Sequence, residues 1–166
     1  MALDALDRGI LQLLHRNGRM PYSVIARELH SNEATVRKRV ERLLRDGVVE
    51  IVGVSNPYCL GLETHVLIGL EVELSSLDEI AGRLAQMEEF SYVACATGTY
   101  DIVVVGVFAS DAELYDFLTG KLAAIEGIRK THTTHLLRLM RRTFTYPIPV
   151  GSATGAEDGF SLAERQ

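Results

Sequence analysis

Two short stretches of this sequence hold side chains that could bind a ligand. One is ATGTYD at residues 96–101, where hydroxyl groups, a glycine and a carboxylate stand together. Backbone amides and hydroxyls can bind the carboxylate of an α-amino acid, and an aspartate can pair with its ammonium group. The alternative is a plain turn between two strands, with the aspartate bonded to nearby backbone. The candidate effector-binding residues in this stretch are Thr97, Gly98, Thr99, Tyr100 and Asp101.

The second stretch, NEATVRKRVERLLRDG at residues 32–47, carries five cations in a chain whose formal net charge is -5. Its apolar residues Val36, Val40, Leu43 and Leu44 recur at helical spacing and should face a core. The opposite side combines small residues with flanking cations, which lets a helix approach base edges in the major groove of DNA. A merely solvated charged face is the alternative, because three acidic residues dilute the charge. The candidate DNA-binding residues are Asn32, Ala34, Thr35, Arg37, Lys38, Arg39 and Arg42.

Charge and composition bound the possible functions. Residues 1–55 hold nine Lys/Arg against seven Asp/Glu, whereas residues 56–144 hold seven against twelve. Such a contrast indicates that the N-terminal part meets a polyanion. The 166 residues, 47% of them hydrophobic, suffice for one medium or two small globular domains. No apolar run could cross a bilayer and the N-terminus lacks a signal-peptide pattern, so we expect a cytoplasmic protein without membrane contact.

Three helices with short connections are expected in residues 1–47. Apolar spacing predicts a first helix that ends near Gly18 and a second, shorter helix in residues 21–30. Asn32 is suited to cap the third helix and Gly47 to end it. The length of the second helix and the tight connection before the third favour a helix-turn-helix DNA-binding domain over residues 1–47.

The pattern changes after this domain. Residues 48–62 are rich in β-formers and predict a β-strand wing and linker, with a hinge at Asn56-Pro57. Residues 63–146 alternate as β-α-β-β-α-β, which is typical of a ferredoxin-like α/β sandwich. Its helices should begin at Ser76, with Glu79 at capping-box distance, and at Ser110, and its last strand should run over residues 128–146. Residues 147–166 are expected to be a flexible tail.

The two cysteines do not predict a metal site. Cys59 and Cys95 are far apart in the sequence and lack metal-ligand spacing. We expect both to be reduced side chains that pack in the interior. The sequence predicts no metal and no cofactor.

Four segments occur in the order and spacing of a known family: LDALDRGIL, GRMPYSVIARELHSNEATVRKRVERLLRDGVV, NPYCLG and TGTYD. The chain thereby resembles the Lrp/AsnC transcriptional regulators, or feast/famine proteins, over about residues 2–146. The resemblance implies an α+β fold with an N-terminal winged helix-turn-helix and a ferredoxin-like domain that senses a ligand and oligomerises. Family members commonly carry Gly-Leu-Ser before the recognition helix, where this chain has His30, Ser31 and Asn32.

The resemblance also implies how such a protein assembles. Homodimers form through the C-terminal sheets and often assemble into octamers, and paired recognition helices call for a roughly palindromic operator. The family's effector site surrounds the Gly and Asp of TGTYD at an interface between dimers. By the same resemblance Thr134, His135 and Leu136 face that site. His132 and His135 could favour an acidic or polar effector, make the response pH-dependent, or lie on a solvated face.

Two functions other than that of a regulator fit parts of the sequence. Sirohaem decarboxylases share the architecture, and His132 and His135 beside Tyr100 and Arg138 could bind a tetrapyrrole carboxylate. Against an enzyme, the sequence has no nucleophile–base pairing, phosphate loop or HExxH motif, and it retains the cations and TGTYD. A ligand-binding module without a DNA site is the other alternative. We therefore predict a DNA-binding transcriptional regulator that responds to a small effector, an amino acid or a related metabolite, and that is not an enzyme.

Overall fold

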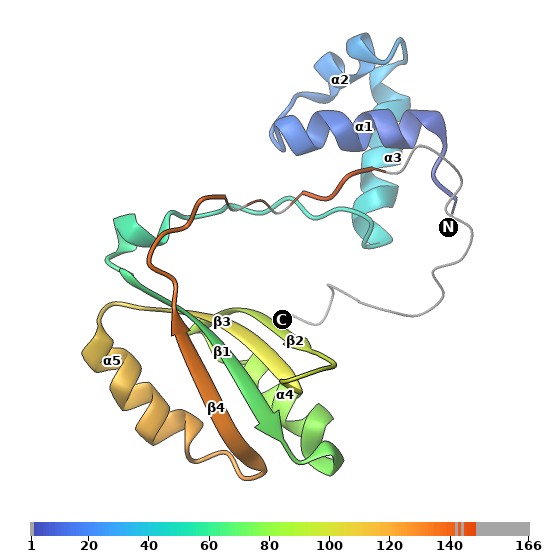
Figure 1. Ribbon diagram of the computed structural model, residues 1–166. Helices are drawn as coiled ribbons and strands as arrows, with labels where there is room; N and C mark the ends of the chain where they lie inside the picture. The colour runs from blue at the N-terminus through green and yellow to red at the C-terminus, as the bar shows by residue number, and fades with distance from the viewer. Residues whose placement is uncertain (1, 142, 144, 149–166) are drawn as a thin grey trace. The chain divides into compact units, whose positions relative to one another are not determined.

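The computed structural model describes residues 2–141, 143 and 145–148. The chain divides into two compact units (Figure 1), one formed by Met1–Gly53 with Thr143–Gln166 and the other by Val54–Arg142. The first unit is helical, and the second is built on a sheet.

The first unit contains three helices: α1 (Ala5–Arg16), α2 (Tyr22–Glu28) and α3 (Glu33–Arg45). A capping box begins α1, because the Asp4 carboxylate accepts a hydrogen bond from the Asp7 amide while the Asp7 carboxylate accepts one from the Asp4 amide. Asn32 caps α3 as the sequence predicts: its Oδ1 accepts a hydrogen bond of 2.8 Å from the Thr35 amide.

Apolar side chains of all three helices form the core of this unit. Val36, Val40 and Leu43 of α3 are fully buried, as their spacing predicts. Leu44 is expected beside them, but it is 38% exposed, because the next position on a helix lies about 100° further round, at the edge of the apolar stripe. Ile148, assigned from sequence to the flexible tail, packs partly buried against this core. The other residues of that tail, apart from Pro147, lie outside the described part.

The connection between α2 and α3 contains an unusual backbone conformation. His30 has a φ of 50°, the left-handed region that glycine adopts without strain. The Lrp/AsnC regulators that the sequence resembles commonly have glycine at this position. The turn keeps its shape here, since the Ser31 amide donates a 2.8 Å hydrogen bond to the Ala26 carbonyl. The chain therefore reaches the helix-turn-helix geometry at some cost in backbone strain.

The predicted β-strand wing and linker does not form. Residues 48–62 contain no strand; Pro57–Leu60 forms a short 3-10 helix, begun by Asn56, whose side chain accepts a hydrogen bond from the Tyr58 amide. Residues such as Val52 and Val54 have the β-propensity that led to the prediction, yet a strand also needs a neighbour with which to exchange backbone hydrogen bonds. No described segment of the chain pairs with this one as a strand.

The second unit is a ferredoxin-like sandwich, as predicted. Its elements are β1 (Thr64–Val72), α4 (Leu77–Ala85), β2 (Phe90–Cys95), β3 (Ile102–Phe108), α5 (Asp111–Asp116) and β4 (Ile128–His135). The four strands form an antiparallel sheet in the order β2-β3-β1-β4, and Figure 1 shows them side by side in this order. A π-helical stretch at Phe117–Leu122 continues α5.

The two faces of the sheet differ. Burial along β3 alternates strictly, so that Ile102, Val104 and Phe108 lie in the core against the two helices. The intervening Val103 and Val105 lie on the opposite face and are only half-buried. The helices therefore cover one face of the sheet, and no described segment of this unit forms a layer on the other face.

Three local expectations for this unit are wrong. Ser76 precedes α4 but makes no capping hydrogen bond, because a short 3-10 turn, Leu74–Ser76, leads into the helix; Ser110 does cap α5. The last strand ends at His135 instead of continuing to residue 146: the Leu136 amide still bonds to the His65 carbonyl, but β1 begins at Thr64 and offers no further partner. Both cysteines are exposed, Cys59 in the 3-10 turn and Cys95 at the end of an edge strand.

Candidate DNA-binding and effector sites

The exposed side of α3 carries fewer free cations than the sequence indicates. Ala34 and Lys38 are both exposed on the side opposite the buried valines, and Thr35 is half-buried nearby. Within the described part of the chain, Lys38 has no hydrogen-bond or ion-pair partner. A small residue next to a free cation, close to the N-terminal end of the helix, suits contact with base edges.

Arg37 lies at the flank of this surface in a local cluster. Its Nη2 lies 3.0 Å from Oε1 of Glu33, one turn earlier, and its guanidinium stands over the Tyr22 ring at 5.2 Å from the ring centre. Both side chains of the ion pair are about half exposed, so the pair contributes little to stability. Arg37 therefore stays accessible to a phosphate at small cost.

Arg39 and Arg42 point instead to α1. Nη1 of Arg39 lies 2.6 Å from Oδ2 of Asp4 and 3.2 Å from Oδ1 of Asp7, and Nη2 of Arg42 lies 2.6 Å from Oδ2 of Asp7. Asp7 is 1% exposed, whereas both arginine side chains are 30% exposed. Two cations assigned to DNA from the sequence thus neutralise carboxylates of their own domain, and whether they also reach DNA stays a prediction.

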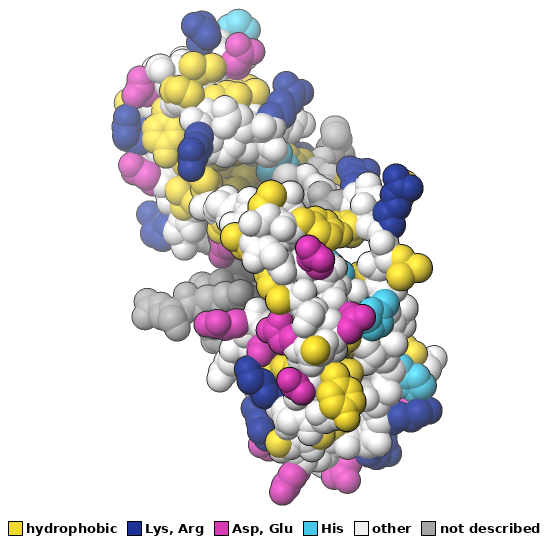
Figure 2. Space-filling model, turned by 90° about the vertical axis from the view of Figure 1, so that its left-hand side faces the viewer, with side chains coloured by type: hydrophobic (Ala, Val, Ile, Leu, Met, Phe, Trp, Pro, Cys, Tyr) yellow, Lys and Arg dark blue, Asp and Glu magenta, His cyan; other side chains and the backbone are white. Residues whose placement is uncertain are grey.

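Asp4 and Asp7 are the residues that sequence reasoning missed. Their three-residue spacing in LDALD was a usable signal, because it places both on one side of a helix, where they match the Arg39–Arg42 spacing on α3. Figure 2 agrees with this distribution: in the helical unit at the top of the view, Lys and Arg side chains are interspersed with acidic and apolar ones and form no continuous patch on that face.

The ATGTYD loop is a tight connection between β2 and β3. Gly98 has a φ of 121°, so the expected positive φ is present. The Ala96 amide donates a 2.8 Å hydrogen bond to the Asp101 carbonyl, and Oδ2 of Asp101 accepts one of 2.8 Å from the Val72 amide at the end of β1. The carboxylate that was expected to meet an ammonium group is therefore fixed by backbone of the neighbouring strand. Thr97 and Thr99 are exposed.

Tyr100 links this loop to the uncovered sheet face. Its ring lies directly over Gly69, where an added Cβ would come within 2.5 Å of ring carbons. The ring also lies 5.3 Å from that of His132, which stands opposite Gly69 on β4. Nε2 of His132 lies 3.5 Å from Oε1 of Glu71, and Lys130 approaches the same oxygen at 3.7 Å. Sequence reasoning left the role of His132 open among several alternatives, and it did not foresee Glu71 or Gly69.

The other predicted effector residues lie at the far end of the sheet. Thr134 pairs with Leu67 and His135 with Val66, whereas the loop is bonded to Leu70 and Val72. Val72, which binds the Asp101 carboxylate, is about 16 Å from Leu67 at the usual rise of a strand. Gly69, over which the Tyr100 ring lies, is only two residues from Leu67. Thr134 and His135 also face opposite sides, and His135 lies 3.9 Å from Asp111 at the start of α5. Leu136 follows β4, and its amide donates a hydrogen bond to the His65 carbonyl of β1. One chain therefore does not bring Thr134, His135 and Leu136 together with the Asp101 carboxylate.

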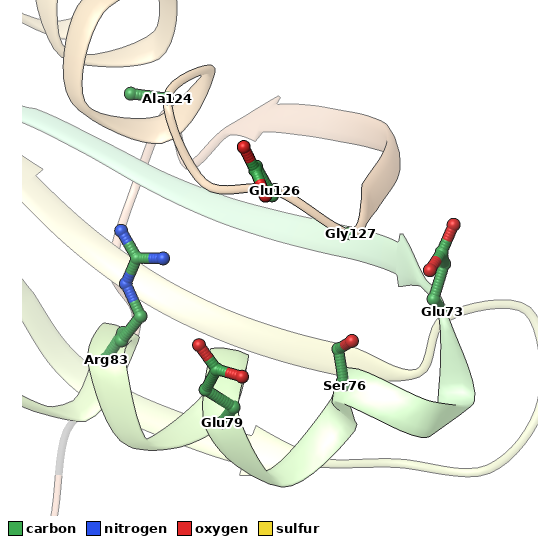
Figure 3. A pocket seen from close by; sticks show the side chains of 7 residues that line it. All are labelled: Glu73, Ser76, Glu79, Arg83, Ala124, Glu126 and Gly127. Atoms are coloured by element: carbon green, nitrogen blue, oxygen red, sulfur yellow. The ribbon is translucent and has the colours of Figure 1, made fainter.

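The helix-covered side of the sheet has a shallow hollow of about 370 Å³ between α4 and the segment before β4. Figure 3 shows its charged side chains, Glu73, Glu79, Glu126 and Arg83, all of which are exposed to solvent. None of the predicted site residues lines it. Over the described residues there is no cluster of three potential metal ligands and no helix long and apolar enough to span a membrane.

Both parts of this chain match known protein families. Residues 3–44 match the AsnC-type helix-turn-helix domain and residues 65–145 match the Lrp/AsnC ligand binding domain. The chain belongs to the Lrp/AsnC family. An uncharacterised HTH-type transcriptional regulator of Pyrococcus furiosus is 40% identical over 135 residues, which cover 81% of this chain and 91% of that protein. The HTH-type regulator Ptr1 of Methanocaldococcus jannaschii is 32% identical over 147 residues, 88% of this chain and 99% of its own length.

Solved structures have the same architecture. AsnC of Escherichia coli superposes with a TM-score of 0.79 at 26% identity, covering 87% of this chain and 99% of that one. A Neisseria meningitidis regulator solved as a complex with L-Met gives 0.80 at 20% identity, covering 87% and 96%. The Lrp/AsnC chain is thus a helix-turn-helix transcriptional regulator with a ligand-binding domain. The Pyrococcus and Methanocaldococcus relatives are both named as transcriptional regulators, and neither name supports the decarboxylase alternative.

Proposed function

We propose that this Lrp/AsnC chain binds DNA through α3, with Ala34 and Lys38 at base edges and Asn32, Thr35 and Arg37 near the phosphates. The observation that carries this proposal is the position of Lys38: it is exposed beside a small residue on the side of α3 that faces away from the core. Lysine can bind guanine at the major-groove edge, and Ala34 can contact a thymine methyl group. A regulator of this kind acts in the cytoplasm, where it meets its DNA.

The uncovered sheet face supports assembly into a homodimer. Tyr92, Val103, Val105 and Leu67 lie on this face, and Tyr92 is 55% exposed. A second copy would bury these side chains and would present two α3 helices to a roughly palindromic operator. Octamers would require a further contact between dimers.

An effector site built from more than one copy of the chain would account for the distance between Asp101 and Thr134 along the sheet. In one chain, the Asp101 carboxylate lies beside Val72, while Thr134 and Leu136 lie beside Leu67 and His65. A neighbouring copy could supply the second set to the loop of the first. The meningococcal regulator of the same fold was solved with L-Met, so an amino acid is the effector class to test first.

The test is a binding titration at several salt concentrations. It compares a duplex from upstream of the protein's own gene with a scrambled duplex of equal length, with and without each amino acid. Lys38→Ala should weaken binding to the native duplex by roughly 10-fold or more, as loss of one base contact does. It should also reduce the preference of the protein for the native duplex over the scrambled one. Glu50→Gln is the control, because Glu50 is exposed and lies outside α3.

Two results would contradict the proposal. Absence of binding to either duplex at low salt would contradict DNA binding through α3. Binding that none of the amino acids alters, by affinity or by oligomeric state, would contradict the assignment of an amino-acid effector.

A further inference from the structure

Two carboxylates at the start of α1 pair with two cations of the recognition helix. Asp4, the N-cap of α1, and Asp7 lie three residues apart, and Arg39 and Arg42 have the same spacing on α3. The three contacts between them, at 2.6, 3.2 and 2.6 Å, place two negative and two positive charges in one cluster. Arg39 and Arg42 therefore contribute little net charge toward DNA while these contacts last.

The two carboxylates differ in how firmly they hold their partners. Asp7 is 1% exposed and its shortest contact, 2.6 Å, is to Arg42, so that pair is a fixed part of the domain. Asp4 is 49% exposed and contacts Arg39 at 2.6 Å, closer than the 3.2 Å contact between Arg39 and Asp7. Asp4 is thus the main partner of Arg39, and water or another ion can reach this pair.

The directions of two pKa shifts agree with Asp4 as the main partner of Arg39. The hydrogen bond from the Asp7 amide, and then that from Arg39, lower the pKa of the Asp4 carboxyl below its ordinary value. The hydrogen bond to Asp4 raises the pKa of the Arg39 guanidinium above its ordinary value. Each group stabilises the charged form of the other.

DNA phosphate is the other anion that an arginine on the flank of a recognition helix can meet. A cation that already pairs with a carboxylate must leave it before it can neutralise a phosphate and release a counterion. We propose that Asp4 competes with DNA phosphate for Arg39 and thereby lowers the affinity of the protein for DNA of any sequence. This inference rests on the proposed binding of DNA through α3.

The test replaces Asp4 without removing the helix cap. Asparagine at this position can still accept the 2.8 Å hydrogen bond from the Asp7 amide, and it is as good an N-cap as aspartate. Asp4→Ser also caps but is too short to reach Arg39. Both variants should bind native and scrambled duplexes more tightly at low salt, with a salt slope steeper by about 0.9, the value for one additional phosphate. Between 50 and 200 mM salt, this steeper slope corresponds to an additional loss of DNA affinity of roughly 3-fold.

Two controls separate competition from other effects. Glu28→Gln changes the net charge by the same amount at an exposed residue of α2, and it should leave the slope unchanged. The double variant Asp4→Asn with Arg39→Gln should lose the gain, because the freed cation is gone. Arg39→Gln alone should leave the wild-type slope in place.

Failure of the competition between Asp4 and phosphate can be distinguished from failure of DNA binding through α3. Wild-type protein that binds DNA, with both Asp4 variants matching Glu28→Gln in affinity and slope, would overturn the competition while leaving the DNA-binding function intact. A gain that survives in the double variant would also overturn it. Wild-type protein that binds no duplex would overturn both.

Discussion

The buried carboxylate of Asp7 should be the main polar stabiliser of the helical unit. Asp7→Asn keeps the shape of the side chain but removes its charge and one acceptor oxygen, so that Arg39 or Arg42 would face an amide NH2 group. Removing one partner of a fully buried ion pair costs about 3–5 kcal/mol. The two arginine side chains are 30% exposed, so water replaces part of the interaction. We expect a loss of about 2–3 kcal/mol, below that range because of this exposure.

Hydrogen exchange measured on separate peptides is the suitable assay, because a chain of two units need not unfold in one step. In Asp7→Asn, amides of α1 and α3 should exchange faster by the corresponding roughly 30- to 150-fold, while those of the sheet unit keep their rates. The melting temperature of the helical unit should fall by roughly 8–20 °C.

Asp46→Asn is the matched control, because within the described part of the chain the Asp46 carboxylate pairs with the adjacent Arg45, whose side chain is 73% exposed. Its effect should stay within about 0.5 kcal/mol. If Asp7→Asn changed the exchange of α3 no more than this control does, the ion-pair cluster would not be what fixes α1 on α3, and the reasoning would be refuted.

Three further predictions concern local features. His30→Gly should stabilise the helical unit by about 0.5–1 kcal/mol in urea unfolding, since glycine adopts the φ of 50° without strain; an unchanged or lower stability would contradict this. Gly69→Ala should displace the Tyr100 ring from the sheet, seen as altered tyrosine and His132 NMR signals, and should change the effector response; unchanged signals would show that the close contact is not maintained. Burial alone would raise the pKa of Glu89, but the hydrogen bond from Lys121 holds that pKa below the ordinary value of 4.5. The pair should therefore stabilise the sheet unit above pH 4.5 and lose its contribution as the pH falls further, a trend that Lys121→Met should remove in acid-unfolding curves.

Much of the fold followed from local patterns. The spacing of Val36, Val40 and Leu43 predicted the buried side of α3, and Asn32 predicted where that helix begins. The β-α-β-β-α-β order was enough to predict the ferredoxin-like unit, because few topologies accommodate it. Two strand predictions failed, for the wing and for the end of β4. Their residues favour a strand, but no described segment pairs with them as a neighbouring strand.

By itself, then, the sequence determined the family, the two kinds of domain and the helix expected to meet DNA, because these depend on residue types at fixed spacing along the chain. Tertiary structure decided which charges are free. Arg39 and Lys38 are adjacent in sequence and alike in charge, yet Arg39 meets the carboxylates of α1 and Lys38 is exposed without a partner in the described chain. The tertiary structure likewise separated Thr134 from the Asp101 carboxylate along the sheet. The physical reason is the same in both cases: an ion pair or a binding site depends on distances between segments far apart in the sequence, and these are fixed only when the helices and strands pack.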